Sequence, residues 1–143
     1  MSWIAVAATV ASTAISAYSS YQNNKAAGKQ AEADADAARA QGRVEAERIR
    51  KEKQKVQSAA RAAAAENGLA VNEGTSIVIN DRIEQDANYD ANMAEITGFN
   101  SSQRLKAEAS AYRKNANTAA VTGALNTVAA GASGYNKSKG GWK

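Results

Sequence analysis

Apolar residues recur at helical spacing through the middle of the chain. Over residues 29–66 they return about every seven positions, and Gly42 is the only glycine. From about Ile77 onward, a second series follows steps of three and four residues. The two series are Ala37, Val44, Ile49, Val56 and Ala63, and then Ile79, Ile83, Ala87, Ala91 and Ala94. This pattern predicts two long helices.

Two turn signals interrupt the helical pattern. The stronger one spans residues 67–76, where Asn67-Gly68 suits a left-handed helix stop and Thr75 or Ser76 suits the N-cap of the next helix. The weaker one is Gly98 with the polar residues 100–102, which predicts a kink or short break before the helix continues over 103–112. We expect the main reversal of the chain at residues 67–76.

Charge divides the sequence into three zones. Residues 1–24 and 115–136 carry no charged side chain, and all 14 acidic residues lie between Glu32 and Glu108. We therefore interpret residues 1–24 as a neutral amphipathic helix and 25–114 as a charged helical hairpin. Residues 115–143 form a small-residue helix with a basic tail.

The signs of the charges predict how the helices pair. Residues 39–61 hold eight basic and three acidic side chains, whereas residues 66–95 hold seven acidic and one basic. A hairpin centred near residue 71 brings these blocks together. The expected neighbours are Arg61 with Asp81 and Glu84, Lys53 and Lys55 with Asp86 and Asp90, and Asp34 and Asp36 with Arg104 and Lys106. Solvated faces, or pairing between subunits, would satisfy the same charges.

The neutral segments carry the candidate packing residues. On a helical wheel, residues 2–23 separate into an apolar sector and an uncharged polar sector, and residues 115–136 repeat the scheme. Gly123, Thr127 and Gly131 form a small-xxx-small series that permits close helix contact. The candidate membrane or helix-packing residues are Trp3, Ile4, Val10, Ile15, Tyr18, Gly123, Val128, Gly131, Tyr135 and Trp142. The candidate polar stripes are Thr9, Ser12 and Ser16, and Thr118, Thr122 and Asn126.

Two environments suit these neutral segments. Each is long enough to cross a bilayer, but its hydroxyl and amide groups disfavour a lone membrane span. Amphipathic spans would need several copies that shield their polar stripes from lipid. The alternative is a set of alanine-rich helices buried inside a soluble oligomer. A signal peptide is disfavoured because the first basic side chain is Lys25.

The amino-acid composition limits the kinds of catalytic and metal sites that the chain can form. Alanine occupies 35 positions, Pro, Cys and His are absent, and only one Phe and two Trp supply large rings. Without Cys or His there is no thiolate or imidazole ligand or nucleophile, and we expect no catalytic site, metal site or cofactor. Carboxylate pairs such as Glu45/Glu52 or Asp86/Asp90 would sit on exposed helices. Arg39–Arg61 permits non-specific DNA contact, although acidic residues are interleaved there. The sequence therefore favours an all-α, long antiparallel hairpin completed by oligomerisation.

The layout resembles the small internal core, or ejection, proteins of short-tailed bacteriophages. The resemblance is carried by Arg61-Ala62-Ala63 through Glu73-Gly74-Thr75-Ser76, then by Asp81-Arg82-Ile83 and Ala91-Asn92-Met93. It implies a protein stored inside the virion near the portal and among other core proteins. Such proteins leave the particle before the genome and help form a conduit across the host envelope, including its outer membrane. The alternative is a purely structural core or portal-associated adaptor with no membrane phase.

Overall fold

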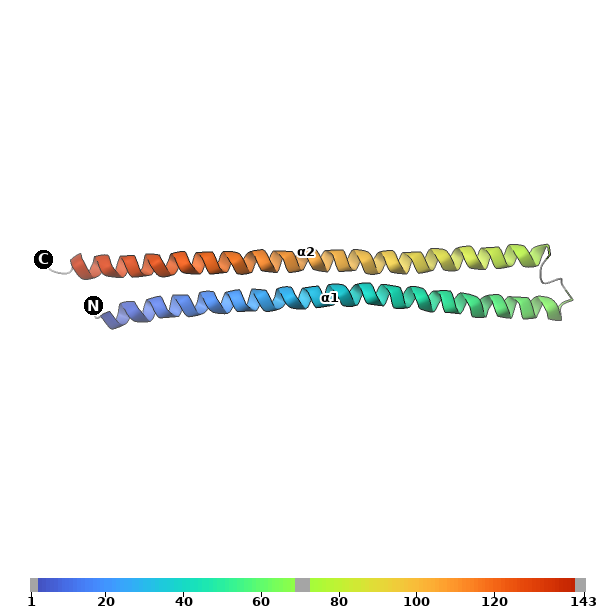
Figure 1. The fold of residues 1–143 in the computed structure, drawn as a ribbon, viewed down its shortest axis with the longest axis horizontal. Helices are drawn as coiled ribbons and strands as arrows, with labels where there is room; N and C mark the ends of the chain where they lie inside the picture. The colour runs from blue at the N-terminus through green and yellow to red at the C-terminus, as the bar shows by residue number, and fades with distance from the viewer. Residues whose placement is uncertain (1–2, 69–72, 141–143) are drawn as a thin grey trace. The chain divides into compact units, whose positions relative to one another are not determined.

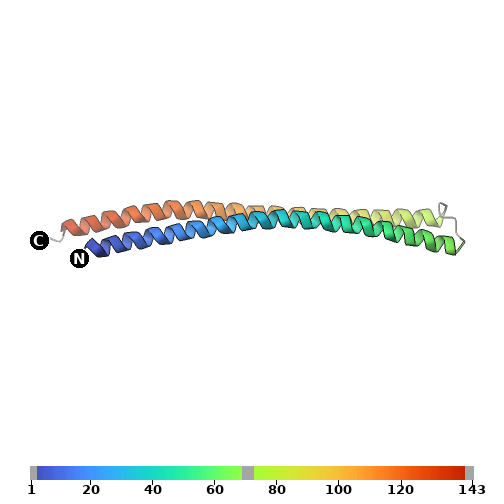
Figure 2. The same cartoon turned by 60° about the horizontal axis from the view of Figure 1, so that its bottom comes forward.

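The computed structural model describes residues 3–68 and 73–140, and the side chains of residues 7–68 and 73–136. It contains two long helices, α1 (Trp3–Glu66) and α2 (Thr75–Gly140). Their contacts divide the chain into a terminal unit, formed by the residues before 34 and after 105, and a central unit of residues 34–105. Figures 1 and 2 show α1 and α2 running side by side within each unit. The predicted all-helical fold of two packed helices is confirmed.

The reversal in the central unit uses the predicted turn residues. α1 ends with hydrogen bonds from the Asn67 amide to the Ala63 carbonyl oxygen and from the Gly68 amide to the Ala65 carbonyl oxygen. Gly68 and Gly74 have φ angles of 71° and 60°, in the left-handed region that glycine adopts without a steric penalty. The Val78 amide bonds the Gly74 carbonyl oxygen, so Gly74 is the N-cap of α2. The cap thus lies one residue before the predicted Thr75.

The predicted break near Gly98 is wrong, because α2 continues through residues 98–102 without interruption. Gly98 and Ser102 are instead buried where α2 faces α1. A Cβ atom added to Gly98 would lie 2.8 Å from the Cα of Gly42 and 3.0 Å from the carbonyl oxygen of Ala38. Gly98 therefore permits two helix backbones to touch, and its lack of a side chain serves packing rather than bending.

Small residues form the seam between the helices in both units. Among the side chains of residues 7–68 and 73–136, the buried apolar ones are all alanines: Ala31, Ala35, Ala46, Ala91, Ala109 and Ala116. Buried positions recur at intervals of seven residues, as in Gly28, Ala35 and Gly42, and also at intervals of eleven residues, as in Ala91 and Ser102. Both intervals return to the same side of an α-helix, because they complete about two and three turns.

The two predicted stripes had different outcomes. In α1, Val44 and Val56 are exposed along with Ala37 and Ala63, and only Ile49 is partly buried. In α2, Ile83, Ala87, Ala91 and Ala94 do face the seam, whereas Ile79 is exposed. The α1 pattern thus predicted the helix correctly, but it does not mark the face that contacts α2. That face instead includes the small residues Gly42 and Ala46.

Cross-helix contacts fix the register inside each unit. Gly42 meets Gly98 in the central unit and Ala17 meets Gly123 in the terminal unit, so both pairs are centred on position 70, next to the predicted 71. Arg50 Nη2 lies 2.9 Å from Glu95 Oε1, and Lys53 Nζ lies 3.8 Å from Glu84 Oε1. In the terminal unit the cross-helix ion pair joins Glu32 and Arg113. Charge signs predicted the pairing of the blocks, but Lys53 pairs with Glu84 rather than with Asp86 or Asp90.

Candidate assembly surfaces

The structure separates the predicted packing residues of the C-terminal segment into two groups. Gly123 is buried at the seam, where a Cβ atom would overlap the side chain of Ala17. Gly131 is half-buried, with open space where its Cβ would lie. Val128 and Tyr135 face away from the seam, and Val128 is 71% exposed. Gly123 of the small-xxx-small series thus lies in the contact between the helices, while the large side chains of Val128 and Tyr135 lie on the outer side of α2.

Two further residues extend this outer surface of α2. Val121 and Leu125 are 61% and 64% exposed and precede Val128 by steps that continue the same helical face. Together with Ala132 and Tyr135 they follow steps of four, three, four and three residues. We call Val121, Leu125, Val128, Ala132 and Tyr135 the α2 outer stripe. Val121 and Leu125 are absent from the predicted packing residues, although their helical spacing could have identified them.

The N-terminal segment of α1 is arranged in a similar way. Val10 is half-buried at the seam, whereas Ile15 and Tyr18 are 68% and 65% exposed. Ala8 and Ala11 precede Ile15 on the same exposed side and complete a second uncharged apolar face. The predicted side-chain roles of Trp3, Ile4 and Trp142 lie outside the described side chains. The described part of the terminal unit therefore presents an apolar outer face on each helix.

The predicted polar stripes are exposed, and several of their hydroxyl groups bond to their own helix. The Ser12 hydroxyl donates to the carbonyl oxygen of Thr9, and the Ser16 hydroxyl donates to that of Thr13. The oxygen–oxygen distance is 3.0 Å in both hydrogen bonds. The Thr118 hydroxyl donates to the carbonyl oxygen of Lys114 at the same distance of 3.0 Å. Thr122 and Asn126 share the exposed side of α2. Because these three hydroxyl protons have partners inside the helix, losing water there costs less free energy than it would for an unpartnered hydroxyl.

A groove with acidic side chains lies along one side of the central unit. Its volume is about 530 Å³, and both helices contribute to it. The lining comprises the apolar residues Ile49, Val56, Ile83 and Ala87, the carboxylates of Glu45, Glu52, Asp86 and Asp90, and the cations of Arg48 and Lys53. The structure thus gathers both carboxylate pairs noted in the sequence, on side chains that remain exposed.

Arg48 neutralises part of this groove. Its guanidinium lies 2.6 Å from Glu45 Oε1 and 3.4 Å from Glu52 Oε2. The hydrogen bond from Arg48 lowers the pKa of the Glu45 carboxyl below its ordinary value, and the same contact raises the pKa of Arg48. Asp86 and Asp90 form no ion pair with another described residue. The carboxylates of the groove that form no ion pair with a described residue are therefore both on α2.

Four arginines of α1 lie on the side of the central unit across the seam from this groove, interspersed with carboxylates such as Glu47 and Glu95. Arg39, Arg50 and Arg61 are spaced by eleven residues and so lie on one side of α1. The Arg39 guanidinium lies over the Phe99 ring at 5.8 Å from its centroid, and Arg50 binds Glu95. Arg61 forms no ion pair with another described residue. We call this side, with Arg43 included, the arginine side.

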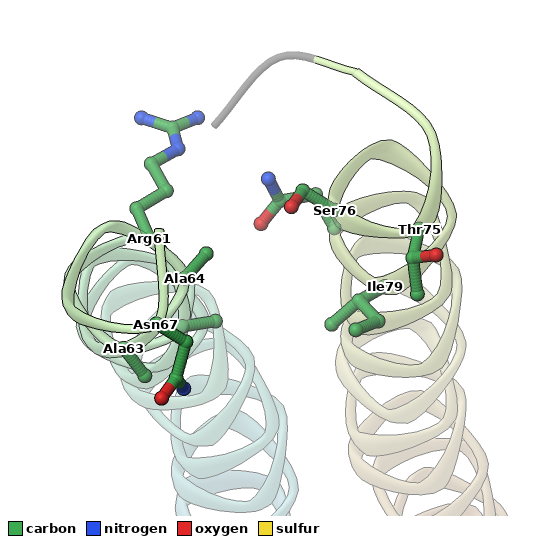
Figure 3. A pocket seen from close by; sticks show the side chains of 9 residues that line it. Arg61, Ala63, Ala64, Asn67, Thr75, Ser76 and Ile79 are labelled. Atoms are coloured by element: carbon green, nitrogen blue, oxygen red, sulfur yellow. The ribbon is translucent and has the colours of Figure 1, made fainter. Parts of the chain in front are cut away.

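A smaller cavity of about 250 Å³ lies between the helix ends in the central unit. Figure 3 shows Ala64 of α1 and Ser76 of α2 pointing toward each other across it, while Arg61 extends away. Asn80 also lines this cavity, and its buried Oδ1 accepts no hydrogen bond from the described residues. Arg61 is the one charged side chain of the lining, so the cavity holds no pair of groups for acid–base chemistry.

Two properties of the described residues bear on the predicted membrane and metal roles. Within residues 3–68 and 73–140, no stretch of helix is both long enough and apolar enough to cross a membrane. The same residues contain no cluster of three or more His, Cys, Asp or Glu side chains able to hold a metal ion. Comparisons with protein-family models, with curated proteins and with solved structures found no match to the chain.

Proposed function

We propose that this chain is an internal virion protein of a short-tailed bacteriophage that helps to form an oligomeric conduit across the host envelope for genome delivery. In this role it is stored near the portal, packs with copies of itself and with other core proteins, and later reaches the host outer membrane. The observation that carries the proposal is the outward orientation of the large apolar side chains in the terminal unit. The resemblance of residues 61–93 to ejection proteins supports the biological setting.

The outer faces of the terminal unit suit two successive environments. An exposed stripe such as Val121–Tyr135 is expected to be covered in the working form of a protein, because water contact with that much apolar surface is unfavourable. Helices of neighbouring proteins would cover it in the stored particle. In the envelope, the same stripe would contact lipid, while the hydroxyl groups that bond to their own helix would lie toward neighbouring helices or water.

Release of a dye from liposomes tests the membrane phase. Purified wild-type protein is expected to form oligomers on vesicles made of bacterial envelope lipids and to release the dye. The variant Leu125→Lys/Val128→Lys should release at least about tenfold less, because a charge on the lipid-facing side of a helix is costly in hydrocarbon. The control Val44→Lys/Val78→Lys alters equally exposed residues of the central unit and should release dye like the wild type. Wild-type protein that neither binds the vesicles nor assembles on them would refute the membrane phase.

A purely structural adaptor is the second candidate. The observation that favours it is the exposure of large apolar side chains in the charged central unit, including Val44, Tyr89 and Phe99. Such residues among charges suit a protein partner better than lipid. Imaging and cross-linking of intact particles would distinguish the candidates, since an adaptor stays at a fixed position next to the portal after the genome has left.

Non-specific DNA contact through residues 39–61 is a subsidiary prediction. Retention of the purified chain on DNA that falls steeply as salt rises would support it.

A further inference from the structure

The terminal unit has an uncharged apolar face on each of its two outer edges. The α2 outer stripe is one of them. The other is formed by exposed residues of α1, which we call the α1 outer face: Ala8, Ala11, Ile15 and Tyr18. Residues 7–24 and 115–136 contain no charged side chain, so covering either face removes no charge from water. Both faces are therefore suited to contact with another uncharged apolar surface.

The two faces point in opposite directions. Ala17 and Gly123 meet in the contact between the helices. Ile15 lies two residues before Ala17, and Leu125 lies two residues after Gly123, so each is about 160° around its helix from that contact. Both side chains are accordingly exposed. One chain cannot cover its α2 outer stripe with its own α1 outer face.

The two faces also occupy the same levels along the helices. In the terminal unit, the contact of Ala17 with Gly123 places residues whose numbers sum to 140 at the same level. Four pairs match to within one residue, or about 1.5 Å, and they are Ala8/Ala132, Ala11/Val128, Ile15/Leu125 and Tyr18/Val121. A second copy beside α2 in the same orientation would present its α1 outer face at these levels without a shift along the helix axis. This correspondence favours a second copy over a lipid surface, which requires no register.

The side chains of both faces suit a contact between helices. Each face follows steps of three and four residues, the spacing of a coiled-coil seam. Half of the α1 outer face is alanine, which leaves room for the larger side chains of the α2 outer stripe. The Ser12 hydroxyl beside the face donates to a carbonyl oxygen of its own helix, and the Tyr18 hydroxyl accepts a 2.7 Å hydrogen bond from Gln22. Covering these polar groups therefore costs less free energy than covering unpartnered ones.

We infer that the α2 outer stripe docks on the α1 outer face of a second copy of this chain in the same orientation. The contact joins two different surfaces, so addition of copies continues until a ring closes. A contact between two α2 outer stripes would leave the α1 outer face of each copy in water, whereas this one contact covers both kinds of face. The inference names the neighbouring helix that covers the stripe in the proposed function, and it rests on that function for its biological role.

The area of the contact indicates how strongly one pair of copies is held. The large exposed side chains of the two faces would together bury on the order of 300–600 Å², and they are Val121, Leu125, Val128, Tyr135, Ile15 and Tyr18. A specific, stable pair of proteins buries about 1,200–2,000 Å². Two copies therefore associate weakly, and association strengthens when a closed ring gives every copy two contacts.

Cross-linking of engineered cysteines tests the contact, because the chain has no cysteine of its own. Chains with Ile15→Cys are mixed with chains with Leu125→Cys, and a short bis-maleimide reagent is added without lipid. A covalent dimer of one chain of each kind should form at least about tenfold more than the dimer of either variant alone, since linkage requires the two thiols to be close. The double variant Ile15→Cys/Leu125→Cys should give a ladder of dimers, trimers and larger species, because its two cysteines lie on opposite edges of one chain. Circular dichroism confirms that each variant remains helical.

Matched controls separate the contact from random collision. Ser12→Cys mixed with Thr118→Cys uses two exposed positions, but Thr118 is level with residue 22, ten residues or about 15 Å from Ser12. This pair should give only background linkage. Adding Val128→Lys to the Leu125→Cys chain should lower the mixed dimer to that background, because the contact would remove the new charge from water. Adding Val78→Lys, which alters a similarly exposed valine of the central unit, should leave the yield unchanged.

Three outcomes would overturn the inference. The mixed dimer could be no more abundant than in the control pair, or Val128→Lys could leave its yield unchanged. Leu125→Cys alone could give the most dimer, which would assign the stripe to the stripe of another copy. Dye release from liposomes by wild-type protein, together with any of these results, would leave the proposed function standing and reject this contact alone. Efficient formation of the mixed dimer by a protein that does not bind vesicles would keep the contact and reject the membrane phase.

Discussion

Replacing Gly98 with alanine tests the close helix contact of the central unit. An alanine in a helix interior is normally more stable than glycine by about 1 kcal/mol, so the propensity alone predicts a gain. The new Cβ would lie 2.8 Å from the Gly42 Cα, whereas ordinary contacts begin near 3.4 Å. The helices must therefore separate locally by about 0.6 Å, the difference between these two distances.

The cost of that separation exceeds the gain in propensity. The atoms that the new methyl group meets belong to the backbone of α1 and cannot rotate away. Overpacking a tight contact costs about 1–3 kcal/mol, and a backbone-to-backbone contact belongs to the upper part of that range. After subtraction of the propensity gain, we expect Gly98→Ala to lower the free energy of unfolding by about 1–2 kcal/mol.

Gly131→Ala is the matched control in the same helix. A Cβ atom at Gly131 meets nothing within 4 Å, so only the propensity gain of about 1 kcal/mol applies. Urea unfolding followed by far-ultraviolet circular dichroism should place the two variants about 2–3 kcal/mol apart, with the wild type between them. Equal stabilisation by both substitutions would refute the tight contact between Gly42 and Gly98.

Three further predictions concern single contacts. Gly68→Ala should lower the free energy of unfolding by about 1–2 kcal/mol, measured by urea unfolding, because alanine is strained at the φ of 71° that ends α1; an unchanged midpoint would contradict this. Arg50→Gln should cost only about 0.2–1 kcal/mol in the same assay, because its ion pair with Glu95 is nearly half exposed to solvent, and a loss well above that range would show that the pair is screened from water. The pKa of Glu45 is lowered in the folded chain, so its contribution to stability is present above the unfolded pKa near 4.5 and is lost as the pH falls through the folded value. Titration followed by NMR of the Glu45 carboxyl carbon should give a lower pKa than in Arg48→Gln, and equal values would exclude the contact.

The sequence by itself determined the helices and the turn. An alanine-rich chain without proline favours helix throughout, and this preference is a local property of each residue. The turn at residues 67–76 was also predictable, since Gly68 and Gly74 are the described residues whose backbone enters the left-handed region. The opposite net charges of the blocks 39–61 and 66–95 also predicted the approximate register of the two helices. This prediction rests on the net charge of whole segments rather than on single side chains.

Which residues form the seam between α1 and α2 depended on the tertiary structure. Hydrophobicity singled out Val44 and Val56, but the helices approach through Gly42, Ala46, Gly98 and other small residues. At Gly42 and Gly98 the two backbones touch because both residues are glycine, and that condition joins residues far apart in sequence. The interpretation of Gly98 as a break failed for the same reason, since a single helix considered alone gives glycine no other role.

The outer surfaces follow from that seam. Once small residues fill the contact between α1 and α2, Leu125 and Val128 have no place inside the hairpin and lie on its outside. Their apolar character and spacing could be seen in the sequence, but their direction could not. Local preferences act within one helix and so determined where the helices form. Packing depends on how the atoms of two helices fit together. Only the folded pair therefore decided which sides of the helices face each other and which face outward.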